Sequence, residues 1–335
     1  MSGVTEEPRA PAGVLAVPSD RVGLDEWLAR RSLPRVRLSP QELAARRTAT
    51  VSVVVPAREV AATIGQIVDE LLRFERAGAV DEVLVVDAAS SDGTAALAER
   101  HGARVVQESD LLPEIGPCRG KGDAMWRALS ATEGEVVAYL DGDTQDFGPR
   151  FLVGLLAALF DDSSLEFVKG TFARPFKTDK GEVIAHGGGR VTELMARPLL
   201  NLHCPALAGF SQPLAGEVAA RRGLLEALPF PVGYGVETAM LLDAASLVGV
   251  EAMAQVDLGT RQNRHQSLRE LSAMAYAVLV AGSRRVLGDE ALEALDPGTI
   301  MLPGLEGADV DPRRVAVEER PPLRTLARRR HVGRA

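Results

Sequence analysis

The chain lacks the features that mark secreted, membrane-spanning and disulfide-rich proteins. Its two cysteines, Cys118 and Cys204, are too few for a disulfide framework and lack metal-site spacing, so we expect ordinary thiols in a reducing compartment. The longest strongly apolar stretch, 151–160, is about half the length that a membrane-spanning helix needs. The first residues are acidic where a secretory signal is basic and then apolar. We therefore expect a cytoplasmic protein with no membrane partner.

Aromatic residues are also scarce, at 4%, and no basic stretch is interleaved with them. The net charge of −8 repels nucleic acid, so we exclude nucleic-acid binding. No Gly-x-Gly-x-x-Gly follows the first predicted strand and no Gly-x-x-x-x-Gly-Lys-Ser/Thr occurs, which argues against hydride transfer and P-loop hydrolysis. What the chain does have is 335 residues with 46% apolar content, enough for a large globular core.

Apolar runs alternate with helical periods in the first half of the chain. Four runs have the character of buried strands: 51–55, 82–86, 104–106 and 136–140. Helices are predicted through 64–72, from polar capping residues at 90–94 to His101, and over 122–132. This alternation predicts an α/β fold with a mostly parallel sheet. In the less periodic second half we predict a strand near 252–258 and helices over 190–200, 235–248 and 268–287.

The most informative feature is Asp141-Gly142-Asp143, directly after the strand-like run 136–140. Alternation along an extended segment places the two carboxylates on the same side, at the sheet edge where open α/β folds bind ligands. Such a pair suits a Mg²⁺ ion that carries phosphates. A solvated turn is the alternative.

Other polar and turn residues follow the neighbouring strands. Pro56 and Ala57 end the first predicted strand and Asp87 ends the second, so they converge with the acidic pair and favour a nucleotide cleft. Asp87 has an alternative role as a helix cap. Lys121, between two glycines at a helix start, suits a pyrophosphate or ribose contact, although a solvated loop remains open.

Three further clusters lie in the second half. The segment 186–193 combines three glycines with Arg190 and Thr192, which suits an acceptor's anionic group, or is merely a loop before a helix. Glu237 lies at another loop-to-helix junction. His265 or Asn263, in the segment 261–265, is a candidate third ligand for a metal held by the acidic pair, although a lone histidine is more often structural.

Taken together and in unbroken order over about 50–280, these motifs resemble the glucosyl-3-phosphoglycerate synthases, a family of retaining GT-A glycosyltransferases. The stretches that carry the resemblance are 53–57, 86–94, 120–126, 141–143, 187–199, 212–217 and 233–237. The resemblance implies a GT-A fold, a Rossmann-like and mostly parallel sheet with a smaller acceptor-binding half. It also implies a divalent cation, Mg²⁺ or Mn²⁺, and a homodimer.

The resemblance assigns roles by position. The donor nucleotide-sugar would be held by Pro56, Ala57, Glu59, Asp87, Lys121, Asp141, Gly142 and Asp143. The catalytic group would comprise Leu214 through its carbonyl, Glu237 and Asp143. The acceptor would be held by Gly189, Arg190, Thr192 and His265. The metal would be held by Asp143 with Asn263 or His265.

Three departures from the family pattern bear on these roles. The family loop reads Arg-Glu-His-Arg-Asn where this chain has Arg261-Gln262-Asn263-Arg264-His265, so the metal histidine and the acceptor-side asparagine are exchanged. Ala88-Ala89 replace the usual Ser-Gly, and Val60 follows Glu59, which removes a polar contact near the base or ribose.

We therefore predict transfer of a hexose from a nucleoside-diphosphate sugar, first UDP-glucose, to a small anionic acceptor, first 3-phosphoglycerate. The alternatives are a diverged enzyme of secondary metabolism with a GDP-linked donor and a small carboxylate-bearing thiol, and a non-catalytic nucleotide-sugar binding protein. The predicted organisation is a partly disordered extension with one or two short helices (1–47), a nucleotide-sugar-binding half (48–160), an acceptor-binding half (161–287) and a tail (288–335). We expect the arginine-rich end of the tail, 311–335, to be mobile or to contact a partner chain.

Overall fold

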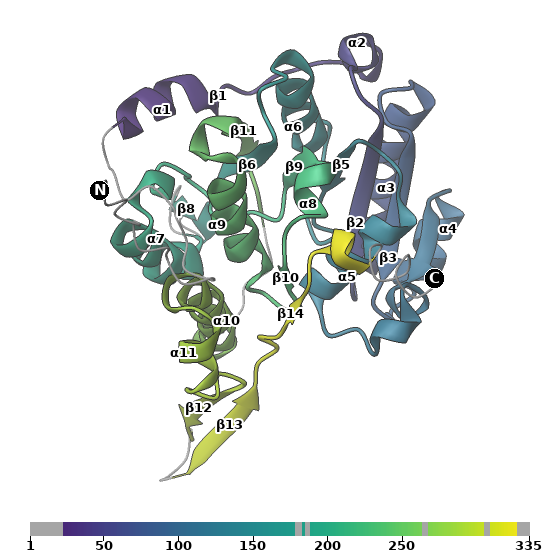
Figure 1. The fold of residues 1–335 in the computed structure, drawn as a ribbon. Helices are drawn as coiled ribbons and strands as arrows, with labels where there is room; N and C mark the ends of the chain where they lie inside the picture. Colours follow the sequence, from purple (N-terminus) through teal and green to yellow (C-terminus); the bar gives the residue numbers. More distant parts are fainter. Residues whose placement is uncertain (1–22, 178–182, 185–187, 263–266, 305–308, 327–335) are drawn as a thin grey trace, which may run out of the picture.

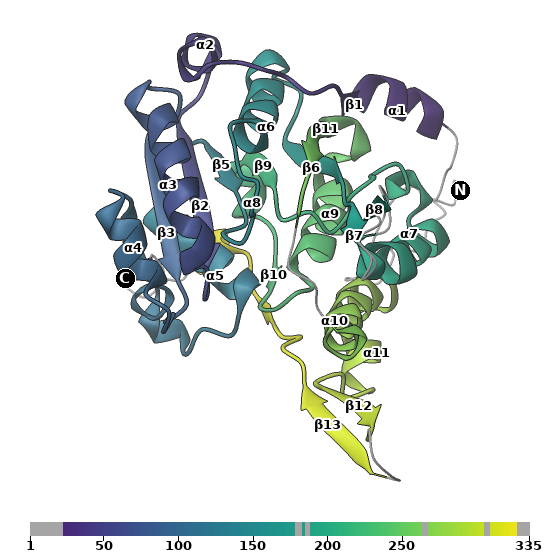
Figure 2. The same ribbon diagram turned by 180° about the vertical axis from the view of Figure 1, so that it is seen from behind.

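The protein is built on one twisted sheet with helices on both faces (Figures 1 and 2). The computed structural model describes residues 23–177, 183–184, 188–262, 267–304 and 309–326. Eight strands form the main sheet in the order β1-β11-β6-β9-β5-β2-β3-β4. Their bounds are β1 Ser32–Leu33, β2 Val51–Ala57, β3 Glu82–Asp87, β4 Arg104–Gln107, β5 Val136–Tyr139, β6 Phe167–Ala173, β9 Val218–Arg221 and β11 Met253–Thr260.

The predicted α/β class and mostly parallel sheet are confirmed. All neighbouring strands pair in parallel except β9, which runs antiparallel to both β5 and β6. The strands predicted at 51–55, 82–86, 104–106, 136–140 and 252–258 are β2, β3, β4, β5 and β11. Because β6, β9 and β11 extend the sheet of the first half, both halves share one framework.

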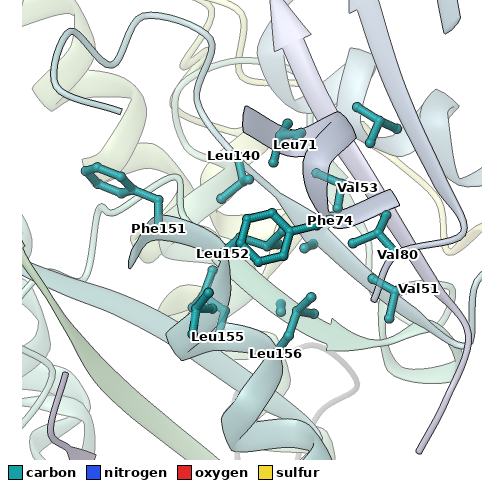
Figure 3. Packing of buried hydrophobic residues seen from close by; sticks show 14 of the residues in the cluster. Val51, Val53, Leu71, Phe74, Val80, Leu140, Phe151, Leu152, Leu155 and Leu156 are labelled. Carbon is teal, nitrogen blue, oxygen red and sulfur yellow. The ribbon is translucent and has the colours of Figure 1, made fainter. Parts of the chain in front are cut away.

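Side-chain alternation along the central strand divides the core into two layers. Val51, Val53 and Val55 of β2 face one side, where they meet α3 (Ala61–Arg76) and α6 (Arg150–Asp161). In this layer Phe74 of α3 lies against Leu152 and its neighbours on α6 (Figure 3). Val54 faces the other side, with α5 (Lys121–Ala128) and α9 (Val236–Val248). Burial on both faces explains why these strands are continuously apolar.

Most predicted helices are found. The helix through 64–72 is α3, 122–132 is α5 with a 3-10 turn over Leu129–Ala131, and 235–248 and 268–287 are α9 and α10 (Leu268–Leu287). The helix predicted over 190–200 contains a π-helical turn, Thr192–Ala196, followed by α7 (Arg197–His203). The other helices are α1 Leu24–Arg31, α2 Pro40–Arg46, α4 Thr94–Arg100, α8 Arg222–Leu225 and α11 Asp289–Glu293. No helix in the described ranges is long and apolar enough to cross a membrane.

One capping prediction is wrong. Helix α4 begins after Gly93, which has φ +87° and offers no side-chain cap. Asp92 instead accepts a hydrogen bond from the Thr94 amide at 3.0 Å. The left-handed turn at Gly93 therefore starts the helix, and the polar side chains before it hold the loop.

The described part of the C-terminal tail contains strands, and the last of them pairs with the body of the protein, while a mobile end or a partner-chain contact over 311–335 stays a prediction. Strands β12 (Thr299–Pro303) and β13 (Val310–Arg314) form a hairpin that projects from the body (Figure 1). The chain then returns as a C-terminal strap, residues 315–326, whose strand β14 (Glu319–Arg320) pairs with β10 (Phe230–Pro231). Outside the main sheet there is also a small hairpin of β7 (Phe176–Lys177) and β8 (Val183–Ile184).

Candidate functional site

The predicted site residues of the first half meet at the carboxyl edge of the sheet. Strands β2, β3 and β5 are parallel neighbours, so Ala57 and Asp87 are directly paired and Asp141 follows the adjacent strand. The buried Asp87 accepts hydrogen bonds from the Ser90 amide at 3.1 Å and from Gln107 Nε2 at 3.0 Å. It therefore holds the turn after β3 and does not cap α4. Its other oxygen, Oδ1, is buried without a hydrogen-bond partner.

Pro56 and Ala57 end β2, and Glu59 lies in the loop that follows. Glu59 has φ +53°, an uncommon conformation for a residue with a side chain. Its carboxylate accepts a hydrogen bond from the Ser91 amide at 2.7 Å, which ties the loops after β2 and β3 together. The two loops are thus held together at the carboxyl edge of the sheet.

Lys121 is the centre of a buried ion cluster. Its Nζ lies 2.5 Å from Asp141 Oδ1 and 2.6 Å from Glu237 Oε1, so three residues predicted separately from sequence are in direct contact. Burial opposes the lysine charge, but the two carboxylates outweigh it and hold the Lys121 pKa well above its usual range. A side chain at Gly122 would overlap the Pro231 carbonyl, so glycine permits this close approach of α5 to β10.

Arg261 joins the second oxygen of Asp141 to two further acids. The arginine is only 2% exposed. Its Nη2 lies 2.8 Å from Asp141 Oδ2 and 3.0 Å from Asp143 Oδ1, and its Nη1 lies 2.8 Å from Glu217 Oε1. Burial penalises the Asp141 carboxylate, yet Lys121 and Arg261 keep its pKa far below the ordinary value. Burial raises the pKa of Glu217 in spite of Arg261.

Sequence reasoning assigned no role to Arg261 or Glu217. The signal was present, because a charged residue directly after a buried strand, as Arg261 follows β11, has to find a counter-charge at the same edge. Gly216 is also informative: any side chain there would overlap the Asp141 carboxylate. The close packing of the segment before β9 onto the acidic pair therefore requires glycine.

Lys169 is a second buried lysine that sequence reasoning missed. It interrupts the apolar strand β6, is 1% exposed, and donates a hydrogen bond from Nζ to the Ala215 carbonyl at 2.7 Å. Burial lowers the pKa of Lys169 to about 8, with Glu237 and Glu217 opposing the change. The ammonium holds the carbonyl of Ala215, the residue after Leu214.

The predicted acceptor residues lie at the start of the 190–203 helical segment. Gly189 has φ +78°, and Thr192 is buried in the π-helical turn, a feature common at functional sites. Leu214 packs against Val191 and Ala196 of the same segment. The structure therefore brings Leu214, Gly189, Arg190 and Thr192 into one neighbourhood.

Only one of the three candidate metal ligands, Asp143, lies within the described residues. No group of three or more His, Cys, Asp or Glu side chains with metal-site geometry occurs in the described ranges. Asn263 and His265 lie outside the described residues. The Asp143 side chain is 54% exposed beside the buried cluster. One accessible carboxylate fits a Mg²⁺ or Mn²⁺ ion, which takes one or two carboxylates and leaves other positions to phosphate and water.

An α/β sheet with an Asp-x-Asp pair after its central strand, facing a helix-borne lysine, defines a GT-A glycosyltransferase. The sequence profile of glycosyl transferase family 2 matches residues 52–210. A glucosyl-3-phosphoglycerate synthase of Mycolicibacterium smegmatis is 40% identical over 304 residues, which is 90% of this chain and 98% of the relative. The chain belongs to the glucosyl-3-phosphoglycerate synthase family, and the resemblance found from sequence is confirmed.

Two solved structures agree. A mannosyl-3-phosphoglycerate synthase from Rubrobacter xylanophilus superposes with a TM-score of 0.82 at 44% identity, covering 90% of this chain and 99% of the other. A glucosyl-3-phosphoglycerate synthase from Mycobacterium tuberculosis, in complex with Mn²⁺, UDP-glucose and phosphoglyceric acid, superposes with a TM-score of 0.77 at 36% identity, covering 88% and 99%. The protein is therefore a glycosyltransferase.

Proposed function

We propose that the protein transfers a hexose, with retention of configuration, from a nucleoside-diphosphate sugar to a small anionic acceptor. UDP-glucose and 3-phosphoglycerate are the first choices, because the M. tuberculosis relative is in complex with UDP-glucose and phosphoglyceric acid. The observation that carries the proposal is the cluster of Lys121, Asp141 and Arg261 at the carboxyl edge of the sheet. Two cations at this edge, the half-buried Lys121 and the buried Arg261, suit a diphosphate.

We assign a divalent cation, Mg²⁺ or Mn²⁺, to Asp143. The M. tuberculosis relative contains Mn²⁺. Asn263 or His265 supplies a further ligand in this proposal. When bound, the ion neutralises the charge that develops on the departing diphosphate.

Lys121 supports the same charge from the protein side. Because Asp141 and Glu237 hold its pKa well above the usual range, its ammonium stays charged at any working pH. Pre-positioned charge of this kind stabilises a leaving group without reorganisation. Glu237, with Lys121 on Oε1, binds hydroxyls of the donor sugar through its other oxygen.

The acceptor is placed by the 188–192 segment and by Leu214. Arg190 binds an anionic group, with the Gly189 backbone and the Thr192 hydroxyl beside it. The Leu214 carbonyl accepts a hydrogen bond from the attacking hydroxyl, and Lys169 fixes the adjoining peptide through Ala215. The hydroxyl oxygen bonds to the anomeric carbon on the face that the diphosphate leaves, and the departing phosphate takes the proton.

A transfer assay tests this proposal. The protein is incubated with 3-phosphoglycerate and either UDP-glucose, GDP-glucose or GDP-mannose, with and without Mn²⁺. We expect a glucosylated product from UDP-glucose that requires the metal and keeps the α configuration by NMR. Absence of transfer from every donor, with intact nucleotide binding, would instead favour the non-catalytic alternative.

Mannose donors are the second candidate. The Rubrobacter relative is a mannosyl-3-phosphoglycerate synthase and, at 44% identity, is more similar to this chain than the M. tuberculosis enzyme at 36%. The sugar is read through hydroxyl orientation at the second carbon, so competition between the two sugars in one assay measures the preference directly.

We also propose a homodimer. The hairpin of β12 and β13 stands away from the body (Figure 1), and its Met301 and Val310 side chains are 60% and 54% exposed. An isolated two-stranded hairpin is only marginally stable in water. A second copy that covers it would remove this apolar surface, and light scattering at several concentrations measures the mass.

A further inference from the structure

The C-terminal strap runs close to the two helices that carry the proposed donor contacts. Its strand β14 lies between α5 and α10 in both views (Figures 1 and 2) and pairs with β10. Helix α5 begins at Lys121, whereas Glu237 lies in the first turn of α9, which packs against α10. Lys121 Nζ and Glu237 Oε1 are 2.6 Å apart, so α5 and α9 meet at this ion pair. The strap is therefore placed where it can influence that contact.

Glu319 of the strap is connected to α9 through one arginine of α10. Its Oε1 lies 2.5 Å from Arg285 Nη1, and Arg285 Nη2 lies 2.6 Å from Asp243 Oδ2 on α9. Arg285 is only 5% exposed. Burial opposes its charge, but Asp243 and Glu319 outweigh burial and keep the Arg285 pKa above its usual range. A single buried guanidinium therefore joins the strap to α9.

Arg320, the next residue of the strap, is connected to α5 instead. Neighbouring side chains on a strand point to opposite faces, so Glu319 and Arg320 reach different helices. Arg320 Nη2 donates to Asp123 Oδ2 at 2.5 Å, and its Nε donates to Asp123 Oδ1 at 2.9 Å. Asp123 is fully buried in the first turn of α5, two residues after Lys121. The strap therefore holds the end of α5 that carries the lysine.

The segment between β10 and α9 is bound to both the strap and α5. The Val232 amide donates a hydrogen bond to the Glu318 carbonyl at 2.9 Å, and the Val232 carbonyl accepts one from the Asp123 amide at 3.2 Å. A Cβ atom at Gly233 would lie 2.6 Å from the Ala316 carbonyl oxygen, so only glycine permits this approach of the two backbones. The start of α9 therefore depends on the strap for its position.

We propose that Glu319 and Arg320 are positioning residues for the donor, because together they fix the spacing of α5 and α9 and so the contact of Lys121 with Glu237. This inference rests on the proposed function, in which Lys121 supports the diphosphate and Glu237 binds hydroxyls of the donor sugar. Glu319 acts on the sugar contact, since it is connected to α9. Arg320 acts on the diphosphate contact, since it is connected to α5.

Calorimetric binding of UDP and of UDP-glucose, each with Mn²⁺, separates the two roles, because UDP has the diphosphate without the sugar. For Glu319→Ala we expect the Kd for UDP-glucose to rise about 10-fold, the size of one lost charge-assisted hydrogen bond, and the Kd for UDP to change less than about 3-fold. For Arg320→Met we expect the Kd values for UDP and UDP-glucose to rise by similar factors.

Glu318→Ala is the matched control, because Glu318 lies in the same strap but its side chain forms an exposed pair with Arg119. It should change each Kd less than about 2-fold. Glu319→Gln keeps a hydrogen-bond acceptor for Arg285 and should give a Kd for UDP-glucose between those of the wild-type protein and Glu319→Ala. Thermal melting of each variant verifies folding.

A double variant distinguishes positioning from a general loosening of the protein. Glu237→Ala removes the sugar contact and leaves Lys121 paired with Asp141. If Glu319 acts through Glu237, adding Glu319→Ala to this variant should not change the Kd for UDP-glucose further. General loosening would instead weaken binding by the same factor in both backgrounds.

The two proposals fail differently. The positioning role is wrong, and the proposed function stands, if Glu319→Ala weakens UDP and UDP-glucose equally, if its effect persists in Glu237→Ala, or if Arg320→Met leaves UDP binding unchanged. If the wild-type protein does not bind UDP-glucose, both are wrong.

Discussion

Two regions differ in how their cations are paired. The donor-side cluster contains Lys121, Asp141 and Arg261, and the acceptor-side cavity lies beside the 188–197 segment. In the first, the half-buried Lys121 and the buried Arg261 each contact at least two carboxylates. In the second, Arg174 has no carboxylate partner among the described residues, although Arg35 and Arg197, which line the same cavity, are paired. Cations that are already paired with carboxylates keep their positions before any ligand binds. A cation without a carboxylate partner can instead pair with a charged group of the ligand. We therefore assign structural support to the donor-side cluster and ligand selection to the acceptor-side cavity.

The substitution with the largest expected effect is Arg261→Met, which tests whether the paired cluster stabilises the protein. It leaves Glu217 buried without its cation, so we expect the free energy of unfolding to fall by about 3–5 kcal/mol. Burial already raises the Glu217 pKa, so in the variant this carboxyl takes up a proton more readily and no longer leaves a buried charge. The loss of unfolding free energy should therefore be smaller at pH 5 than at pH 8. Urea denaturation at both values measures it.

Arg30→Met is the control for that experiment. Arg30 pairs with Glu251 at 3.0 Å, but both side chains are exposed, and such pairs contribute little. We expect a change below about 0.5 kcal/mol. Equal losses in the two variants would mean that the buried network does not support the donor side.

A second prediction concerns the C-terminal strap. Arg320 donates hydrogen bonds to the fully buried Asp123 at 2.5 and 2.9 Å, two residues after Lys121. Asp123 keeps Arg127, so Arg320→Met should cost only about 2 kcal/mol. Because α5 carries Lys121, the KM for the donor should rise while the KM for the acceptor stays constant.

Arg119→Met is matched to that change, because Arg119 joins the same strap to α5 through an exposed pair with Glu318. It should leave stability and both KM values nearly unchanged. An equal rise in both KM values for Arg320→Met would contradict a donor-side role for the strap.

The smallest effect is a pH dependence at Lys169. Burial lowers the Lys169 pKa to about 8, below the ordinary lysine value of about 10.4, so the unfolded chain binds more protons between these values and stability rises with pH there. Relative to Lys169→Met, the wild-type free energy of unfolding should gain about 2 kcal/mol between pH 7 and pH 9.5. Urea denaturation of both proteins at the two pH values measures this gain. If the stability difference between wild type and variant is the same at both pH values, burial does not lower the Lys169 pKa.

Much of the framework was predictable because its signals are local. Runs such as Val51–Val55 are long, β-branched and bounded by turns, and parallel pairing follows from the helices between them. Strands β6 and β9 were not predicted, because Lys169 and Gly170 interrupt one and the other reads Val-Ala-Ala-Arg, which has little strand preference. Both are strands because the sheet buries them between β11 and β5.

The site was predictable where residues follow strand ends. Asp87 and Asp141 were found this way, because parallel strands bring their carboxyl ends together. Lys121 was found from its place between two glycines at a helix start. The position of Arg261 after a buried strand indicates that it needs a counter-charge, but its pairing with Glu217, 44 residues away, is not given by any local pattern. Among the described residues, Arg174 has no carboxylate partner whereas Arg35 and Arg197 have one, and this difference depends on the surroundings of each arginine and not on a local sequence pattern.

The most direct measurement is calorimetric binding of UDP with and without Mn²⁺ to the wild-type protein, Asp143→Asn and Asp146→Asn. Asp146 lies in the same turn but pairs with Arg150 at 2.6 Å, so it serves as the control. We predict that Mn²⁺ strengthens UDP binding to the wild-type protein and to Asp146→Asn but not to Asp143→Asn. Metal-dependent binding that survives in Asp143→Asn would contradict the placement of the diphosphate and its ion at the acidic pair.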